Sequence, residues 1–181
     1  MLEDTILIFK LKHGDRGALS RIYEKYRDDL LRIAAGLLRE QHDAEDIVHE
    51  VFTGFVRGCG QFSLTGSLRG YLTTCVVNGA RSLYRARSRH STVNLDSCEP
   101  PVANRRRPEE WLILDEDFRR LQNALHQLPD EQREAVVLRL QADMRFRDIA
   151  RLQETSVKTA ASRYQYGITK LRTVMNGQAD K

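Results

Sequence analysis

The chain has 181 residues, of which 41% are hydrophobic and 30% are charged, and its net charge at pH 7 is +4. This composition is typical of a globular protein with one core or two small ones, and it excludes a disordered chain. No apolar run is long and uninterrupted enough to span a bilayer, so we expect no membrane insertion. The three cysteines lack a CxxC spacing, which argues against a zinc site and fits a reducing, cytoplasmic location.

Helical periodicity dominates the first half of the chain. Apolar residues recur at three- and four-residue steps over Leu19–Leu37, which predicts a long amphipathic helix. A second helix is predicted over Asp43–Val56, with the Asp43 carboxylate capping backbone N–H groups at its start. Glycines then mark a loop around Gln61–Ser67, and a further helix is predicted over Leu68–Arg89. These elements predict a first, all-helical domain at residues 5–90.

The pattern changes in residues 91–108, which hold three of the four prolines and show no apolar period. We expect a flexible linker there. Helical pattern resumes at Glu109, and Leu128–Glu131 predicts a helix start with proline at the first helical position. Two further helices are predicted within Phe146–Arg172. The second domain therefore covers residues 109–175, and the expected fold class is all-α, with two small helical domains on a tether.

The last two predicted helices have the pattern of a helix-turn-helix. Ser156 is a good N-cap for the second helix, whose apolar residues recur at steps of three and four. The opposite face carries short polar and basic groups suited to base edges and phosphates in a major groove. The core-facing set is Val157, Ala160, Tyr164, Ile168 and Leu171, and the opposite set is Lys158, Thr159, Ser162 and Arg163. An ordinary amphipathic helical hairpin is the alternative interpretation.

Basic and aromatic residues interleave in Gln61–Arg89 and suggest a second nucleic-acid site. Arg81, Arg85 and Arg89 stand at helical i, i+4 and i+8 spacing, which predicts one positive stripe. Aromatic rings beside such a stripe can hold unstacked bases while the arginines follow the phosphate backbone. The rings here are Phe62, Tyr71 and Tyr84. In the alternative interpretation the rings belong to the core and the arginines are simply solvated.

Two groups of motifs resemble those of a known family, the extracytoplasmic-function sigma factors of the sigma-70 family. The resemblance to their region 2 rests on DAEDIVHEVF at 43–52, Phe62, Leu68–Leu72 and Asn78–Ala80. The resemblance to their region 4 rests on LPDEQREAVVLR at 128–139, FRDIA at 146–150 and SVKTAASRYQYGITKLR at 156–172. Order, spacing and linker match as well. The resemblance implies a region 2 helical bundle and a region 4 helix-turn-helix.

Three sets of site residues are implied by this resemblance. The first docks on the coiled coil of the polymerase β′ subunit and comprises Asp43, Asp46, Ile47, Glu50 and Val51. The second reads and melts the −10 promoter element and comprises Phe62, Ser63, Leu64, Arg69, Asn78, Arg81 and Arg85. The third reads the −35 element and comprises Arg147, Thr155, Ser156, Lys158, Thr159, Ser162 and Arg163. The lobe that carries the third set is also expected to engage the β flap.

The implied partners are therefore core RNA polymerase and promoter DNA, and the implied function is promoter recognition in transcription initiation. Family members commonly bind an anti-sigma factor, and the sequence leaves open whether this chain does. The histidines are scattered, and neither HExxH nor GxxxxGK[ST] occurs, so we expect no enzyme, no metal and no cofactor. Two other interpretations stay open: a stand-alone helix-turn-helix DNA-binding transcription regulator, and a helical adaptor without a DNA contact.

Some positions depart from the family pattern. Glu154 stands in the turn of the helix-turn-helix where glycine is usual, and a left-handed backbone conformation is less comfortable for it. Ala160 and Ala161 replace the commoner valine and lysine, which removes one phosphate or base contact. These departures bear on the promoter sequence and on the strength of −35 binding.

Overall fold

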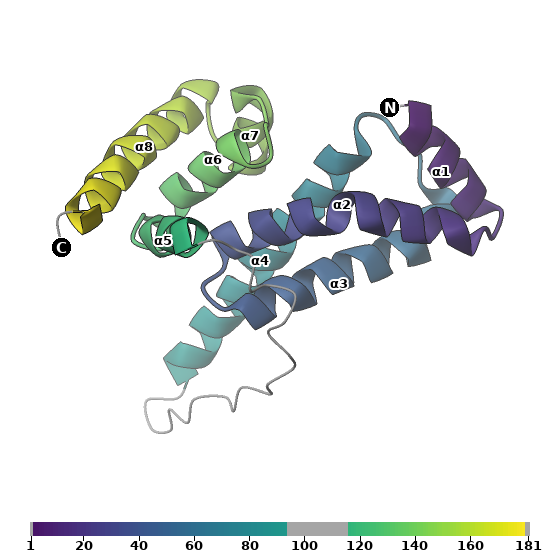
Figure 1. Cartoon of the computed structure of the whole chain (residues 1–181), viewed down its shortest axis with the longest axis horizontal. Coiled ribbons are helices and arrows are strands. Elements are labelled where there is room, and N and C mark those ends of the chain that lie inside the picture. Colours follow the sequence, from purple (N-terminus) through teal and green to yellow (C-terminus); the bar gives the residue numbers. More distant parts are fainter. Residues whose placement is uncertain (1, 94–115, 180–181) are drawn as a thin grey trace.

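The computed structural model describes residues 2–93 and 116–179, and over these ranges the chain is helical without strands. Four α-helices form the N-terminal lobe, with a 3-10 turn at Cys59–Gln61 between the third and the fourth (Figure 1). They are α1 (Leu2–Lys12), α2 (Arg16–Leu37), α3 (Gln41–Gly58) and α4 (Leu68–Val93). Helices α2, α3 and α4 pack on one another, and α1 packs on α2.

The C-terminal lobe is a second helical unit. Its helices are α5 (Glu116–Leu125), α6 (Asp130–Leu140), α7 (Phe146–Leu152) and α8 (Val157–Ala179). Helix α8 packs against α6 and α7, and a short turn joins α7 to α8 (Figure 1). The predicted all-α fold class, with two helical lobes, is confirmed.

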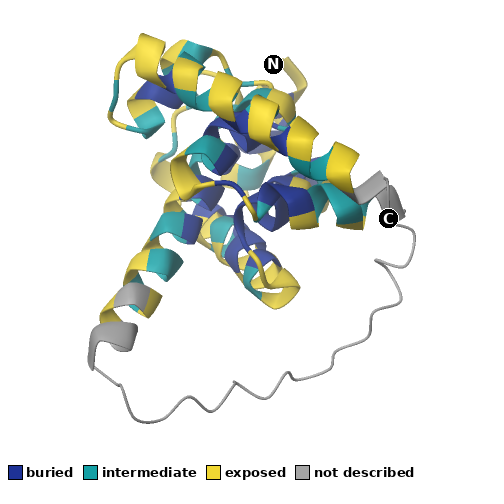
Figure 2. Cartoon of the chain, turned by 90° about the vertical axis from the view of Figure 1, so that its left-hand side faces the viewer, coloured by how far each residue is buried: buried dark blue, intermediate teal, exposed yellow. Residues whose placement is uncertain are grey.

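A single buried core runs through both lobes. Figure 2 shows buried residues gathered where the helices meet and exposed residues on the outward faces. Three small residues, Ala34, Ala35 and Gly36, lie in the last turn of α2, and α6 packs against this helix. A Cβ atom on Gly36 would lie 3.0 Å from Val137 Cγ2 of α6. The lobes therefore pack directly against each other, whereas the sequence predicted two lobes held only by a tether.

Helix α1 was not predicted. Its core-facing residues are Leu7, Ile8 and the half-buried Leu11, a single turn that is too short to stand out as a helical period in the sequence. A polar cluster fixes α1 to α2: the buried Asp4 accepts hydrogen bonds from Lys25 Nζ at 2.8 Å and from Tyr26 Oη at 2.7 Å. Burial alone would raise the pKa of Asp4, but these two donors lower it below the usual value.

Three local predictions differ from the structure. Helix α3 begins at Gln41, so Asp43 lies inside its first turn and pairs with Arg87 of α4 instead of capping the helix. Pro129 precedes α6 as its N-cap, where its carbonyl accepts the first hydrogen bonds of the helix. Val157 starts α8 and is 50% exposed, because the core-facing positions of that helix begin one turn later, at Ala160.

Most of the predicted linker at residues 91–108 lies outside the described residues, as does the predicted helix start at Glu109. Residues 91–93 continue α4, and the described chain resumes at Glu116 in α5. Within residues 2–93 and 116–179, no helix is both long and apolar enough to cross a membrane. The same ranges hold no group of three or more His, Cys, Asp or Glu side chains placed to bind a metal ion.

Candidate nucleic-acid interface

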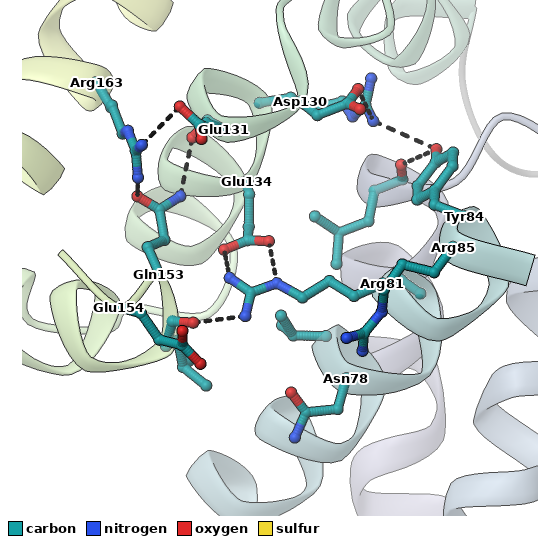
Figure 3. A pocket seen from close by; sticks show the side chains of 15 residues that line it. Asn78, Arg81, Tyr84, Arg85, Asp130, Glu131, Glu134, Gln153, Glu154 and Arg163 are labelled. Atoms are coloured by element: carbon teal, nitrogen blue, oxygen red, sulfur yellow. Dashed lines mark hydrogen bonds and ion pairs between the residues drawn. The ribbon is translucent and has the colours of Figure 1, made fainter. Parts of the chain in front are cut away.

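Arg81 of α4 is held by the C-terminal lobe. Its Nε and Nη2 atoms donate to the two carboxylate oxygens of Glu134 in α6, at 2.9 and 2.6 Å (Figure 3). Its Nη1 atom donates to the carbonyl oxygen of Leu152, the last residue of α7, at 2.5 Å. A bidentate guanidinium–carboxylate pair is among the strong hydrogen-bonded ion pairs of proteins. Arg81, the first residue of the predicted positive stripe, is therefore paired with an acid of the other lobe.

Arg69, near the start of α4, also reaches the other lobe. Its Nη1 and Nη2 atoms donate to the carbonyl oxygens of Ala142 and Gln141, at 2.6 and 2.8 Å. Both carbonyls follow the last residue of α6, where the helix dipole is negative. Its Nε atom donates to Asp29 of α2 at 2.5 Å, and this bond raises the pKa of the guanidinium. Arg69 thus links α2, α4 and the end of α6.

The other predicted −10 residues are more accessible. Phe62 packs against Tyr71 with ring centroids 4.7 Å apart, and Tyr71 is 40% exposed. Both line a cleft of about 750 Å³ with Ser63 and Leu64, whose far wall comes from the C-terminal lobe and includes Arg145. The structure thus brings aromatic, polar and basic groups together there.

Asn78 and Arg85 are exposed and line a second cleft of about 490 Å³ between the lobes (Figure 3). Tyr84, predicted with the base-stacking rings, does not share the pocket of Phe62. It donates from Oη to the Leu37 carbonyl at 2.8 Å, and it accepts a longer hydrogen bond from the buried Arg133. Tyr84 is therefore part of the contact between the lobes.

Helix α8 presents the predicted −35 residues to solvent. Ser156 Oγ accepts a hydrogen bond from the backbone N–H of Thr159 at 3.0 Å, which confirms the predicted N-cap. The side chains of Ser156, Lys158, Thr159 and Ser162 are exposed, and so is that of Arg147 on α7. Thr155 is half-buried in the turn, where its N–H donates to the Ala150 carbonyl. One polar face of the helix-turn-helix therefore collects most of this set.

Arg163 is half-buried, and it forms an ion pair within its own lobe. Its Nη2 atom lies 2.6 Å from Glu131 Oε2, and its Nη1 donates to Gln153 Oε1 at 3.1 Å. Glu131 is on α6, three residues before Glu134 (Figure 3). The acidic face of α6 thus pairs with one arginine from each lobe.

The turn before α8 has the left-handed conformation that its usual glycine would adopt. Glu154 has a φ of 50°, a region that costs a residue with a Cβ atom about 1–2 kcal/mol. The next residue, Thr155, donates its N–H to Ala150 across the turn at 2.9 Å. The glutamate side chain is exposed and lines the cleft between the lobes (Figure 3).

On α3, the predicted docking residues divide into exposed and inward-facing groups. Asp46 and Glu50 are exposed, whereas Ile47 is buried against Gly79 of α4 and Val51 is half-buried. Asp43 is tied to Arg87: the Nη2 atom of the arginine donates to Oδ1 at 2.8 Å. The two exposed acids therefore form the accessible part of this set.

An apolar groove beside these acids was missed. It has a volume of about 580 Å³, lies between α2 and α3, and is lined among others by Tyr23, His49, Phe52 and Val56. Tyr23 and Val56 are 38% and 39% exposed. The sequence pattern assigned both to the apolar faces of their helices, and only their position at the edge of that face leaves them open to solvent.

An acidic helix, an arginine-bearing helix and a capped helix-turn-helix are the features expected of a DNA-binding protein with a further protein partner. The comparisons specify its class. The family described as Sigma-70 region 2 matches residues 22–90, and Sigma-70, region 4 matches residues 118–171. The ECF RNA polymerase sigma factor SigM of Mycobacterium tuberculosis is 30% identical over 166 residues, which are 90% of this chain and 81% of that protein. The RNA polymerase sigma-H factor of Pseudomonas aeruginosa is 25% identical, with 89% and 88% covered.

Solved structures share the fold. The sigma factor RpoE of Bartonella quintana, solved with the anti-sigma factor NepR, is similar with a TM-score of 0.68 at 22% identity, covering 86% of this chain and 97% of that one. CnrH, solved with the cytosolic domain of CnrY, has a TM-score of 0.67 at 20% identity, with 97% and 98% covered. The chain belongs to the extracytoplasmic-function sigma factors of the sigma-70 family. It is an RNA polymerase sigma factor, a subunit that binds core polymerase and directs it to promoter DNA.

Proposed function

We propose that the three surfaces described above divide the work of promoter recognition between two domains. Residues 5–90 dock on core polymerase and read the −10 element, residues 91–108 connect the domains, and residues 109–175 read the −35 element. The observation that carries this assignment is that one chain presents exposed acids on α3, arginines on α4 and a capped polar face on α8. A stand-alone regulator would not need the first of these surfaces.

Docking starts from α3. Asp46 and Glu50 project into solvent one helical turn apart and can pair with basic side chains on the β′ coiled coil. The apolar groove beside Tyr23 and Val56 can receive an apolar side chain of the same partner. The C-terminal lobe engages the β flap, which spaces the two domains along the promoter.

Reading of the −10 element requires a melted strand. Phe62 and Tyr71 offer aromatic faces for an unstacked base, and Ser63, Leu64 and Asn78 line the clefts around them. Arg69, Arg81 and Arg85 supply positive charge for the backbone of that strand. A base held here has left its stack, which costs a few kcal/mol of unstacking, so this site acts after the −35 contact has anchored the chain.

Reading of the −35 element uses the face of α8. Lys158 and Arg147 contact phosphates, and the hydroxyls of Ser156, Thr159 and Ser162 approach base edges in the major groove. The buried Ala160 holds the helix on its lobe, so the polar residues around it face outward. Because alanine stands at positions 160 and 161, where the commoner valine and lysine would add a phosphate or base contact, we expect modest affinity for the isolated −35 duplex.

We also propose that the protein works in the cytoplasm as a non-catalytic subunit, because its role is to position polymerase and the chemistry belongs to the polymerase. An anti-sigma factor is a further proposed partner. The sigma factor of Bartonella quintana was solved with such a protein, and the fold similarity to it supports this proposal.

Transcription in vitro tests the function. Purified protein added to core polymerase lacking any sigma factor should start transcripts at discrete sites of a genomic template library. The change Asp46→Lys should weaken core binding about tenfold and reduce these transcripts in proportion. The matched control is Asp28→Lys on α2, since Asp28 and Asp46 have side chains 70% and 61% exposed.

The control variant should transcribe as the wild type does, and both variants should keep their binding to −35 duplex DNA. An absence of transcripts with wild-type protein from every template would contradict the sigma-factor role. Equal loss of core binding and −35 binding in Asp46→Lys would mean that Asp46 is structural.

A further inference from the structure

Helix α1 has apolar residues on two opposite sides. One side carries Leu7 and Ile8, which are buried against the N-terminal lobe. The other side carries Leu2, Ile6 and Phe9, which are 80%, 48% and 62% exposed. Steps of four and three residues place these three side chains on one face of the helix. Apolar residues that cluster on the surface in this way, instead of being scattered singly, mark an interaction site.

His13 continues this outward face and holds its largest side chain in place. Its Nδ1 atom donates to the Phe9 carbonyl oxygen at 2.8 Å, and the two ring centroids lie 4.2 Å apart. The backbone N–H of His13 also bonds the Phe9 carbonyl, at 3.3 Å, which continues the helical hydrogen bonding one residue beyond Lys12. Phe9 is therefore presented to solvent beside a second ring.

The outward face has the four-three-four spacing of a coiled-coil seam. The seam residues, at positions d, a, d and a of a heptad, are Leu2, Ile6, Phe9 and His13. Glu3 and Lys10 directly follow the two d residues and line one flank of the seam, at e positions. Thr5 and Lys12 line the other flank, at g positions. The first flank thus carries an acid and a base, whereas the second carries no acid.

The charged groups of the first flank can reach a partner. Lys10 is exposed and forms no ion pair within the part of the chain that the structure describes. The Glu3 side chain is 69% exposed; its Oε2 atom accepts a hydrogen bond from Lys25 Nζ, and no described residue donates to its Oε1 atom. The same Nζ atom also donates to the buried Asp4 at 2.8 Å. Helix α1 is therefore anchored to its own lobe while this flank stays open.

The order of the charges favours a second α1 helix in antiparallel orientation. In an antiparallel helix pair, the e residues of one helix face the e residues of the other. Two copies of α1 would then place Glu3 of each copy opposite Lys10 of the other, which gives two complementary pairs. In the same register, Ile6 of each copy packs on Phe9 of the other. A parallel pair would set Lys10 opposite Thr5 and would give no such complementarity.

We propose that the outward face of α1 is a self-association surface, on which a second copy of this chain packs in antiparallel orientation about a twofold axis. Such an interface uses the same face of both copies. Two helices of this length bury less than a standard protein–protein interface, so the dimer is weak and depends on concentration. Figure 1 places α1 and α8 at opposite ends of the molecule, so pairing through α1 leaves the helix-turn-helix of both copies open.

Sedimentation velocity of the full chain over a range of concentrations tests the proposal. The weight-average sedimentation coefficient of the wild type should rise with concentration, and Phe9→Ser should weaken the association about tenfold. The matched control is Tyr166→Ser, because Tyr166 is an aromatic residue of α8 that is 68% exposed. A wild type that stays monomeric at every concentration would overturn the proposal, as would an equal weakening by the control.

An exchange of charges tests the antiparallel register. Glu3→Lys and Lys10→Glu each place like charges opposite each other in a dimer of identical chains, so each variant alone should associate about tenfold more weakly than the wild type. An equimolar mixture of the two variants restores both complementary pairs and should associate as the wild type does. Lys12→Glu is the control, because Lys12 faces Thr5 of the second copy, and it should leave the association unchanged.

Circular dichroism should show the same helical content in every variant. Lys10 pairs with no described residue, and in Glu3→Lys the Asp4 carboxylate still holds Lys25, so both variants should keep α1 in place. A mixture that associates no better than either variant alone would overturn the antiparallel pairing. A loss of association in Lys12→Glu as large as that in Lys10→Glu would overturn it too.

Discussion

The two surfaces proposed to bind DNA differ in what covers them. On α8, Ser156, Lys158 and Thr159 face solvent around a capped helix start. On α4, Arg69 and Arg81 are engaged by the opposite lobe. The surface suited to intact duplex is open, and the surface suited to a melted strand is closed. With the roles proposed for these surfaces, the −35 contact needs no rearrangement of the lobes, whereas the −10 contact needs one.

The largest expected effect comes from removing the covered arginine. Arg81→Ala deletes three hydrogen bonds and leaves the carboxylate of Glu134, only 12% exposed, without its charge partner. Docking of the lobes should weaken by about 2 kcal/mol, because a hydrogen bond to a charged group contributes about that much. Sedimentation velocity should show a more extended particle. Arg85 lies one helical turn further along α4 and is exposed, so Arg85→Ala should sediment as the wild type does. The same expansion in both variants would mean that the bonds of Arg81 do not hold the lobes together.

The C-terminal lobe, which carries the exposed polar face of α8, can be destabilised without changing that face. A Cβ atom on Gly167 of α8 would lie 2.7 Å from Val136 Cγ2 and 3.1 Å from the Gln132 carbonyl oxygen. Gly167→Ala should therefore destabilise the C-terminal lobe by about 1–2 kcal/mol. Gly177 on the same helix has no neighbouring atom within 4 Å, and its alanine variant should be neutral or stabilising by up to about 1 kcal/mol. Urea unfolding monitored by circular dichroism distinguishes the two variants. Equal unfolding midpoints would contradict the close packing of Gly167 against α6.

A fall in pH should weaken the docking of the two lobes. Burial, followed by the positive charges of Arg133 and Arg39, lowers the pKa of His126 to about 4, against a hydrogen bond with the Ala35 backbone that raises it. A solvated histidine has a pKa near 6.5. The neutral form is therefore favoured when the lobes are docked, so docking is fully stable above pH 6.5 and weakens as the pH falls toward 4.

We expect a loss of about 1 kcal/mol in the docking of the lobes at pH 5.5, which lies between the two histidine pKa values. Sedimentation at pH 7.5 and at pH 5.5 should show the wild type expanding at the lower pH. The variant His126→Gln cannot be protonated there and should show little change. An identical response in both proteins would assign the pH dependence to another group.

The smallest expected effect concerns the turn of the helix-turn-helix. Glu154→Gly relieves the left-handed backbone at φ 50°, and the gain is offset in part by the freedom of glycine in the unfolded chain. We expect a stabilisation of less than about 1 kcal/mol, measured by thermal unfolding. Gln153→Gly is the contrasting change, since Gln153 has a φ of −84° and bonds Arg163. It should destabilise the lobe, and a shift of the same sign in both variants would contradict the strain at Glu154.

What could be predicted from the sequence was local. The long apolar periods predicted α2 and α4, and Ser156 predicted a cap three residues before its hydrogen-bond partner. The left-handed turn at Glu154 was likewise expected, because this residue stands where glycine is usual. Neighbouring residues decide such features, because capping and backbone strain act within one helical turn.

The features that could not be predicted depend on distant residues. Glu134 lies 53 positions from Arg81, and Ala142 lies 73 positions from Arg69. A pattern of arginines in one helix predicts a positive stripe but carries no information on which acid from another lobe will neutralise it. The close approach at Gly36 is hidden for the same reason, since its neighbours are more than 100 positions away.

The most direct test of the account is the distance between the lobes with and without polymerase. Spin labels at Lys12 in α1 and Asn176 in α8, both exposed, would report that distance by pulsed electron resonance in a chain whose native cysteines are replaced. We expect one short distance in the free protein and a clearly longer one in the complex with core RNA polymerase. The same distance in both states would contradict it, because the arginines of α4 would then stay covered while the polymerase holds the chain.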